Sequence, residues 1–90
     1  MRLDWADRAS ADLLRAYDFH DQYSNAKAER VVRRLRERAS TLLVTPYVGR
    51  PVGKAGVREL SIPDIQYVIV YRVETDAVEI ARIFSTAENR

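Results

Sequence analysis

Three short apolar runs follow one another between Gly56 and Phe84, and they constrain the fold more than any other feature of this 90-residue chain. The runs are Val57–Ile62, Tyr67–Val73 and Ala77–Phe84. They are rich in β-branched and aromatic residues, they alternate with period two, and polar breaks of hairpin length separate them. The pattern predicts a three-stranded antiparallel meander.

The break before the last run also predicts how the strands pair. A two-residue loop at Thr75 and Asp76 sets the register of the second hairpin. The predicted pairs are Val73 with Val78, Arg72 with Glu79, Tyr71 with Ile80, Ile69 with Arg82, and Tyr67 with Phe84. This register places Arg82 on the face that carries Tyr67 and Tyr71. An arginine among apolar and aromatic strand residues suggests a function.

A strand and two helices are predicted before the meander. The expected elements are an edge strand at Arg2–Trp5, a helix capped by Asp7 or Ser10 and ending near Gln22, and a helix from Ser24-Asn25 to about Leu43. Apolar residues recur in both helices at spacings of three and four, so each has one apolar stripe. Because the break between them is short, we expect an antiparallel helical hairpin that packs against the sheet.

The segment from Thr45 to Lys54 is predicted to be a loop because prolines and glycines crowd into it. No second domain or internal repeat is evident, so we expect one α+β domain over residues 1–90.

Composition narrows the classes of function. No apolar run approaches the ~18 residues of a membrane span. There is no signal sequence and no cysteine, so we expect a cytoplasmic protein without disulfides. The net charge is +2, and Lys27 and Lys54 are the only lysines among 15 basic residues. Arginine suits carboxylates and phosphates, which favours an anionic partner, either nucleic acid or an acidic protein.

The chain has few residues that could bind a metal or take part in nucleophilic catalysis. With one histidine, no cysteine and no glycine-rich phosphate loop, we expect no metal site and no cofactor. His20 lies where the first helix ends, and we favour a packing or capping role over a catalytic base. The arginines of the second helix alternate with Glu29 and Glu37, which favours a solvated face and leaves an acidic partner possible.

Arg58 and Arg82 are stronger candidates for a functional site than His20 or the arginines of the second helix. Arg58 alternates with Leu60 and Ile62, so like Arg82 it projects from an apolar strand. The simpler interpretation is that each stem packs at a rim while the guanidinium reaches water. The alternative interpretation is that these two arginines belong to a functional site.

Several short motifs follow one another in order along nearly the whole chain. They are Trp5, ADLL at Ala11–Leu14, P-x-x-G-R-P at Pro46–Pro51, G-x-R-E-L at Gly56–Leu60, VIVYRV at Val68–Val73 and VEIARIF at Val78–Phe84. With these motifs the chain resembles the RelE/ParE superfamily of bacterial toxins from type II toxin-antitoxin pairs, and most of all its ParE branch.

The resemblance implies a fold of one strand, a helical hairpin and an antiparallel sheet. It also implies a hetero-oligomer with a cognate antitoxin, ParD-like or RelB-like, whose acidic amphipathic tail folds along the toxin. ParE-like members poison DNA gyrase and serve plasmid stabilisation. RelE-like members cleave mRNA on the ribosome with basic residues of the sheet, where Arg58 and Arg82 lie at similar places.

The nuclease pattern is incomplete after Arg82. No Tyr, His or Lys follows to act as general acid or base, and Ser85 stands near the place of a histidine common in the family. We therefore expect a gyrase inhibitor rather than an enzyme. The alternatives are a ribosome-dependent endoribonuclease using Arg58 and Arg82, or a diverged member that only binds antitoxin. The candidate partner-binding residues are Arg58, Tyr67, Tyr71, Arg82 and Phe84.

Overall fold

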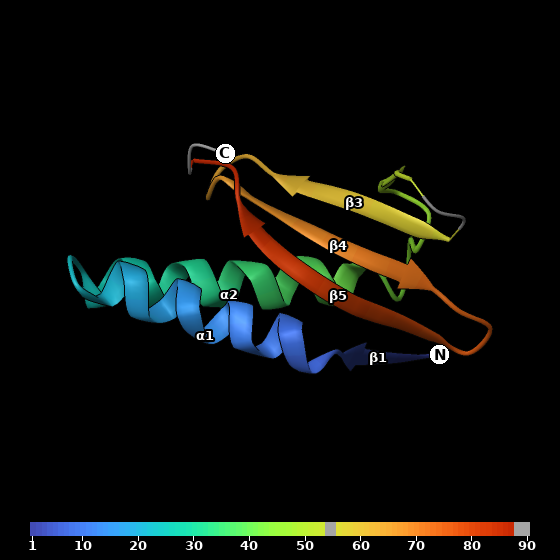
Figure 1. Ribbon diagram of the computed structural model, residues 1–90, viewed down its shortest axis with the longest axis horizontal. Helices are drawn as coiled ribbons and strands as arrows, with labels where there is room; N and C mark the ends of the chain where they lie inside the picture. The colour runs from blue at the N-terminus through green and yellow to red at the C-terminus, as the bar shows by residue number, and fades with distance from the viewer. Residues whose placement is uncertain (54–55, 88–90) are drawn as a thin grey trace.

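A helical hairpin covers one face of a five-stranded sheet in the computed structural model, which describes residues 1–53 and 56–87 (Figure 1). The elements are β1 (Arg2–Trp5), α1 (Asp7–Asp21), α2 (Asn25–Thr41), β2 (Arg50–Pro51), β3 (Val57–Ile62), β4 (Tyr67–Val73) and β5 (Ala77–Ser85). The strand order is β1-β5-β4-β3-β2. The α+β class and the order of elements are as the sequence predicts. The predicted edge strand and the three strands of the meander form one sheet, and the short β2 is added at its other edge.

The two helices form as their apolar spacing predicts. α1 buries Ala9, Leu13 and Ala16, and the same periodicity buries one face of α2 against the sheet. The Ser24 hydroxyl caps α2 by accepting the backbone N–H of Lys27 at 3.2 Å.

The predicted cap of α1 is wrong. Ala6 occupies the N-cap position and no side chain caps the helix there. Asp7 is instead the first helical residue, where its negative charge favours the positive end of the helix dipole.

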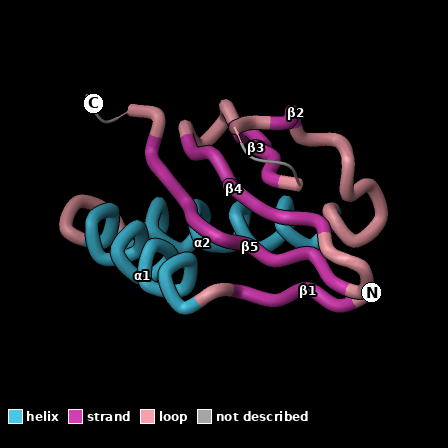
Figure 2. The backbone as a smooth tube through the Cα atoms, turned by 45° about the vertical axis from the view of Figure 1, so that its right-hand side comes forward, coloured by secondary structure: helices cyan, strands magenta, loops and turns pink. Residues whose placement is uncertain are grey.

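β1 lies at one edge of the sheet and runs parallel to β5 (Figure 2). Leu3 lies beside Val78 and Trp5 beside Ile80. A parallel pair needs a long connection, and the helical hairpin and the rest of the sheet lie between these two strands in the chain.

The predicted meander register is correct in its first half only. Val73 lies opposite Val78, Arg72 opposite Glu79, and Tyr71 opposite Ile80. The register then shifts by one residue between Val70 and Tyr71. The observed pairs beyond the shift are Val70 with Arg82, Ile69 with Ile83, Val68 with Phe84, and Tyr67 with Ser85.

The predicted pairs of Ile69 with Arg82 and of Tyr67 with Phe84 are therefore wrong. Ala81 has no partner on β4, as in a β-bulge. The extra residue lets both Ile80 and Ile83 turn into the core, although they are three residues apart. It also moves Arg82 to the face of Val70, opposite to the face of Tyr71.

The long connection before β3 contains one short strand, so the prediction of an unbroken loop is wrong there. Arg50 pairs with Glu59, and Pro51 pairs with Arg58. A proline is tolerated in an edge strand because its missing N–H can face outward. Lys54, the predicted end of the loop, lies outside the described residues.

Candidate functional site

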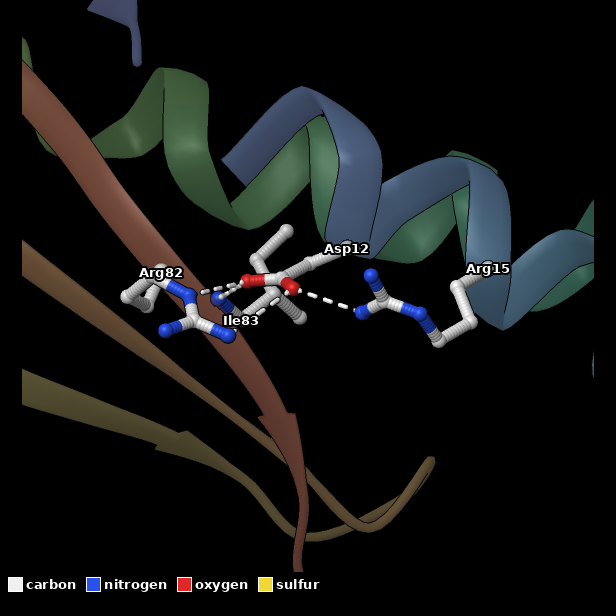
Figure 3. Close-up of polar contacts among 4 residues, drawn as sticks. All are labelled: Asp12, Arg15, Arg82 and Ile83. Atoms are coloured by element: carbon white, nitrogen blue, oxygen red, sulfur yellow. Dashed lines mark hydrogen bonds and ion pairs between the residues drawn. The ribbon is translucent and has the colours of Figure 1, made fainter. Parts of the chain in front are cut away.

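A buried carboxylate on α1 joins the helix to β5 (Figure 3). Asp12 is 5% exposed and each of its oxygens accepts two hydrogen bonds. Oδ2 accepts Arg82 Nε at 2.8 Å and the backbone N–H of Ile83 at 2.9 Å. Oδ1 accepts Arg15 Nη1 at 2.9 Å and Arg82 Nη2 at 3.2 Å. The carboxylate is therefore fully satisfied inside the protein.

The position of this cluster follows from where β1 ends. The last residue of β1, Trp5, pairs with Ile80, and the next backbone bond runs from the Ala6 N–H to the Ile80 carbonyl at 2.9 Å. Beyond that point the described part of the chain places no strand beside β5 on this edge. Asp12 accepts the Ile83 N–H where a neighbouring strand would otherwise supply a carbonyl.

Electrostatics keep Asp12 ionised. Burial by itself raises the pKa of Asp12, but the hydrogen bonds from Arg82, the Ile83 N–H and Arg15 together lower that pKa below its ordinary value. The same ion pair raises the pKa of Arg82. Asp12 is thus a poor proton acceptor, and Arg82 is held by an internal anion.

A pocket of about 250 Å³ opens beside this ion pair. The Arg82 guanidinium lies 4.7 Å from the centre of the Phe84 ring at its wall. The other lining residues are Asp12, Arg15, Ala16, Phe19, Tyr67, Ile83 and Ser85. Two arginines and three aromatic rings give the pocket the chemistry for a group that is partly flat and partly anionic.

Arg58 lies elsewhere and has a different role. Its Nη1 donates to the carbonyls of Gly49 at 2.7 Å and Tyr47 at 3.2 Å, and its guanidinium lies 5.0 Å from the centre of the Tyr47 ring. Arg58 pairs with Tyr71, whereas Arg82 pairs with Val70. The two arginines of the predicted site therefore start from opposite faces of the sheet.

The three aromatic candidates differ in exposure. Tyr71 is fully buried, and its hydroxyl donates to the Pro46 carbonyl at 2.7 Å and accepts the Gly49 N–H at 2.9 Å. Tyr67 is 6% exposed, while Phe84 is half-buried at the pocket wall. A role of any of these residues in binding a partner stays a prediction.

His20 packs against the sheet, in line with the favoured interpretation. Its Nε2 lies 3.0 Å from the Tyr67 hydroxyl. Burial lowers the pKa of His20, and the positive charges of Lys27 and Arg30 lower it further. Within residues 1–53 and 56–87, no three His, Asp or Glu side chains gather as metal ligands would.

Sequence reasoning missed Asp12. The available signal was its place in the apolar stripe of α1, three residues after Ala9 and four before Ala16. An acidic residue at such a position must find a buried partner or remain unsatisfied.

Comparison with known proteins identifies the family. The family model described as ParE toxin of type II toxin-antitoxin system, parDE, matches residues 3–90. The chain belongs to the ParE toxin family. It is also 39% identical over 79 residues to Toxin RelE2 of Caulobacter vibrioides, and the match covers 88% of each chain. This ParE-family protein is therefore a toxin of the RelE/ParE superfamily.

Solved structures agree with that assignment. A chain of the chromosomal ParDE toxin-antitoxin system from P. aeruginosa superimposes with a TM-score of 0.84 at 30% identity, covering 94% of this chain and 95% of that one. The isolated E. coli RelE toxin gives a TM-score of 0.72 at 16% identity, covering 97% and 85%, and shares the fold. In the described ranges of this ParE-family chain, neither helix has the length and apolarity to cross a membrane.

Proposed function

We propose that this ParE-family toxin acts by binding and inhibiting DNA gyrase, and that a cognate antitoxin neutralises it. The family match supports this proposal, because the chain belongs to the ParE toxins and the resemblance to ParE-like members implies gyrase as the target. The observation that carries it is the state of the two arginines that a nuclease would use. Arg82 is bound by the Asp12 carboxylate, and Arg58 is bound by loop carbonyls on the other face of the sheet.

A phosphate-cleaving site needs cationic groups that converge on one phosphate and a group that carries a proton. Arg58 and Arg82 do not converge, and Arg82 would have to leave a buried carboxylate before it could hold a phosphate. The eight residues after Arg82 contain no Tyr, His or Lys. These features favour a toxin that works through protein contacts.

RNA cleavage is the second candidate, and one observation favours it. Tyr67 lines the same pocket as Arg82 and Arg15, and its hydroxyl lies 3.0 Å from His20 Nε2. A Tyr–His pair can carry a proton even though the chain end lacks such a group. The similarity to Toxin RelE2 points in the same direction by its name.

Two assays on the purified toxin separate the candidates. In a supercoiling assay with gyrase, ATP and relaxed plasmid, the proposal expects loss of supercoiling or accumulation of cleaved DNA. Adding the antitoxin should restore normal supercoiling. Full supercoiling at a large molar excess of toxin would reject gyrase as the target.

Primer extension on translated mRNA tests the nuclease. We expect no new cuts. Ribosome-dependent cuts that disappear in Tyr67→Phe and Arg82→Ala, but persist in the exposed control Arg72→Ala, would establish cleavage and overturn the proposal.

An antitoxin partner is supported by the family itself and by solved relatives that include toxin-antitoxin complexes. We propose that its acidic tail crosses the pocket beside Arg82. Titration calorimetry should then show weaker binding for Arg82→Ala and Phe84→Ala. Unchanged affinities for both variants would place the tail elsewhere.

A further inference from the structure

The segment Leu43–Val48, here called the apolar loop, carries an unusual group of exposed side chains. Leu43 is 37% exposed, Val44 83%, Tyr47 64% and Val48 56%. The other large exposed apolar residues are Met1, Leu14, Phe19 and Tyr23, which are spread over the N-terminal part of the chain. Single exposed apolar side chains are ordinary, but a cluster of them on a soluble domain marks a contact surface.

The buried Tyr71 hydroxyl and the partly exposed Arg58 guanidinium hold the backbone of the apolar loop in place. The Tyr71 hydroxyl donates to the Pro46 carbonyl at 2.7 Å and accepts the Gly49 N–H at 2.9 Å. The Arg58 guanidinium donates to the Tyr47 and Gly49 carbonyls at 3.2 and 2.7 Å. A fixed loop loses little conformational entropy when a partner binds its side chains.

The residue that follows the apolar loop, Gly49, packs closely against the sheet. A Cβ at Gly49 would lie 2.6 Å from both the Glu59 carbonyl oxygen and the Tyr71 hydroxyl. The chain therefore runs directly over the sheet at this point. The exposure of Val44, Tyr47 and Val48 shows that these side chains of the loop face outward.

Two arginines, Arg38 and Arg58, lie beside the apolar loop. Arg58 lies against the Tyr47 ring, and Arg38 donates to the Thr41 hydroxyl at 3.3 Å. In the part of the chain that the structure describes, no carboxylate pairs with either guanidinium, whereas Arg50 pairs with Glu59 at 3.0 Å. A partner with acidic groups around an apolar pocket would complement this surface.

We propose that the apolar loop is the surface with which this toxin contacts its protein target, and that it inserts into an apolar pocket with an acidic rim. This rests on the proposed function, which requires a folded target protein. The loop is a fixed projection, and a projection fits a pocket on a folded partner. A disordered antitoxin tail brings its own apolar side chains and needs a groove.

Grooves of that kind lie elsewhere. They are the pocket beside Arg82, which we propose the tail crosses, and two adjoining hollows of about 580 and 490 Å³ along the helical hairpin that share Tyr17, Val32 and Arg36. The apolar loop, on the segment that joins α2 to β3, lies at the other end of the sheet from the C-terminal end of β5 (Figure 1). Target and antitoxin can thus meet separate surfaces.

The test is the double variant Val44→Ser/Val48→Ser, which leaves Tyr47 on Arg58. The matched control is Leu14→Ser/Tyr23→Ser, because these residues are 62% and 76% exposed on the helical hairpin. The toxin concentration for half-inhibition of gyrase supercoiling should rise at least about tenfold for the loop variant and stay within about twofold for the control. Thermal unfolding and antitoxin affinity of the loop variant should match the wild type.

Charge is tested separately with Arg38→Glu. We expect a loss of potency of several-fold, because the substitution places like charges at the rim of the complex. Unchanged potency would reject the acidic rim.

Growth arrest without antitoxin distinguishes failure of this inference from failure of the proposed function. A loop variant that is as potent as the wild type on gyrase overturns the inference and leaves the function standing. A folded loop variant that loses antitoxin binding also overturns it, because the loop would then serve the antitoxin. If the wild type arrests growth but does not inhibit gyrase, the proposed gyrase inhibition is wrong. Loss of growth arrest in the loop variant, with arrest kept in the control variant, then still supports the apolar loop as the surface that contacts the target. A wild type that neither arrests growth nor inhibits gyrase overturns both the inference and the proposed function.

Discussion

Replacing Asp12 with alanine tests whether one buried carboxylate joins the helical hairpin to β5. The substitution removes the acceptor of the buried Ile83 N–H and of both Arg82 contacts. A buried donor that loses its acceptor destabilises the fold by about 1–3 kcal/mol. Truncation also removes the penalty of burying the carboxylate. We therefore expect a net loss of about 2 kcal/mol in the free energy of unfolding, or about 10 °C in Tm.

Urea denaturation followed by the fluorescence of Trp5, the only tryptophan, measures this change. Trp5 is half-buried and packs against the core at the end of β1, close to the cluster in the fold. Asp12→Asn is the matched variant, because it has the same shape and keeps one oxygen for the Ile83 N–H. It should lose about half as much stability.

The dependence on pH gives an independent check. The folded-state pKa of Asp12 lies below its ordinary value of 3.8, so the stabilisation is complete above pH 3.8 and is lost as the pH falls through the folded-state pKa. The pKa of Asp64 is also lowered, chiefly by its hydrogen bond with Arg34, and Asp64 titrates in the same window. The informative quantity is therefore the difference between wild type and Asp12→Asn, which should shrink below pH 3.8.

Two results would refute this reasoning. Asp12→Ala within about 0.5 kcal/mol of the wild type would mean that the cluster contributes nothing to stability. A difference between wild type and Asp12→Asn that stays constant from pH 7 to pH 2 would mean that the charge is not what matters.

Three further predictions concern single positions. The lone histidine, His20, should titrate below pH 6.5 in NMR. The free energy of unfolding should then decline as the pH falls below 6.5, because the unfolded chain binds the His20 proton more readily than the folded chain does. A titration midpoint at or above pH 6.5 contradicts this prediction. Gly49→Ala should lower the free energy of unfolding by about 1–3 kcal/mol in urea through its close contacts, whereas Val48→Ala should change it by less than about 0.5 kcal/mol; equal effects would count against the packing argument. Tyr71→Phe should cost about 1–2 kcal/mol by leaving the Gly49 N–H without its acceptor, and a neutral outcome would show that water replaces the hydroxyl.

The site was predicted in part. Arg58 and Arg82 stood out because charged residues rarely alternate with apolar ones on a strand. Their actual partners could not be read from the chain, because Asp12 is 70 residues from Arg82 and Arg58 is held by backbone carbonyls, which every residue carries.

The amino-acid sequence by itself determined the type and order of the main elements and the family of this protein. Apolar periodicity is a local property, so it predicts helices and strands wherever one face is buried. It also predicted the first half of the second hairpin, where a short turn sets the register.

Only the tertiary structure decided the bulge at Ala81, the pairing of β1 with β5, and the face from which Arg82 projects. These features depend on contacts between distant segments. Strict alternation along β5 would have turned Arg82 inward. Burying both Ile80 and Ile83 required one extra residue in the strand, which moved Arg82 to the other face. Asp12 then accepts the Ile83 N–H and the Arg82 guanidinium at the uncovered edge of β5.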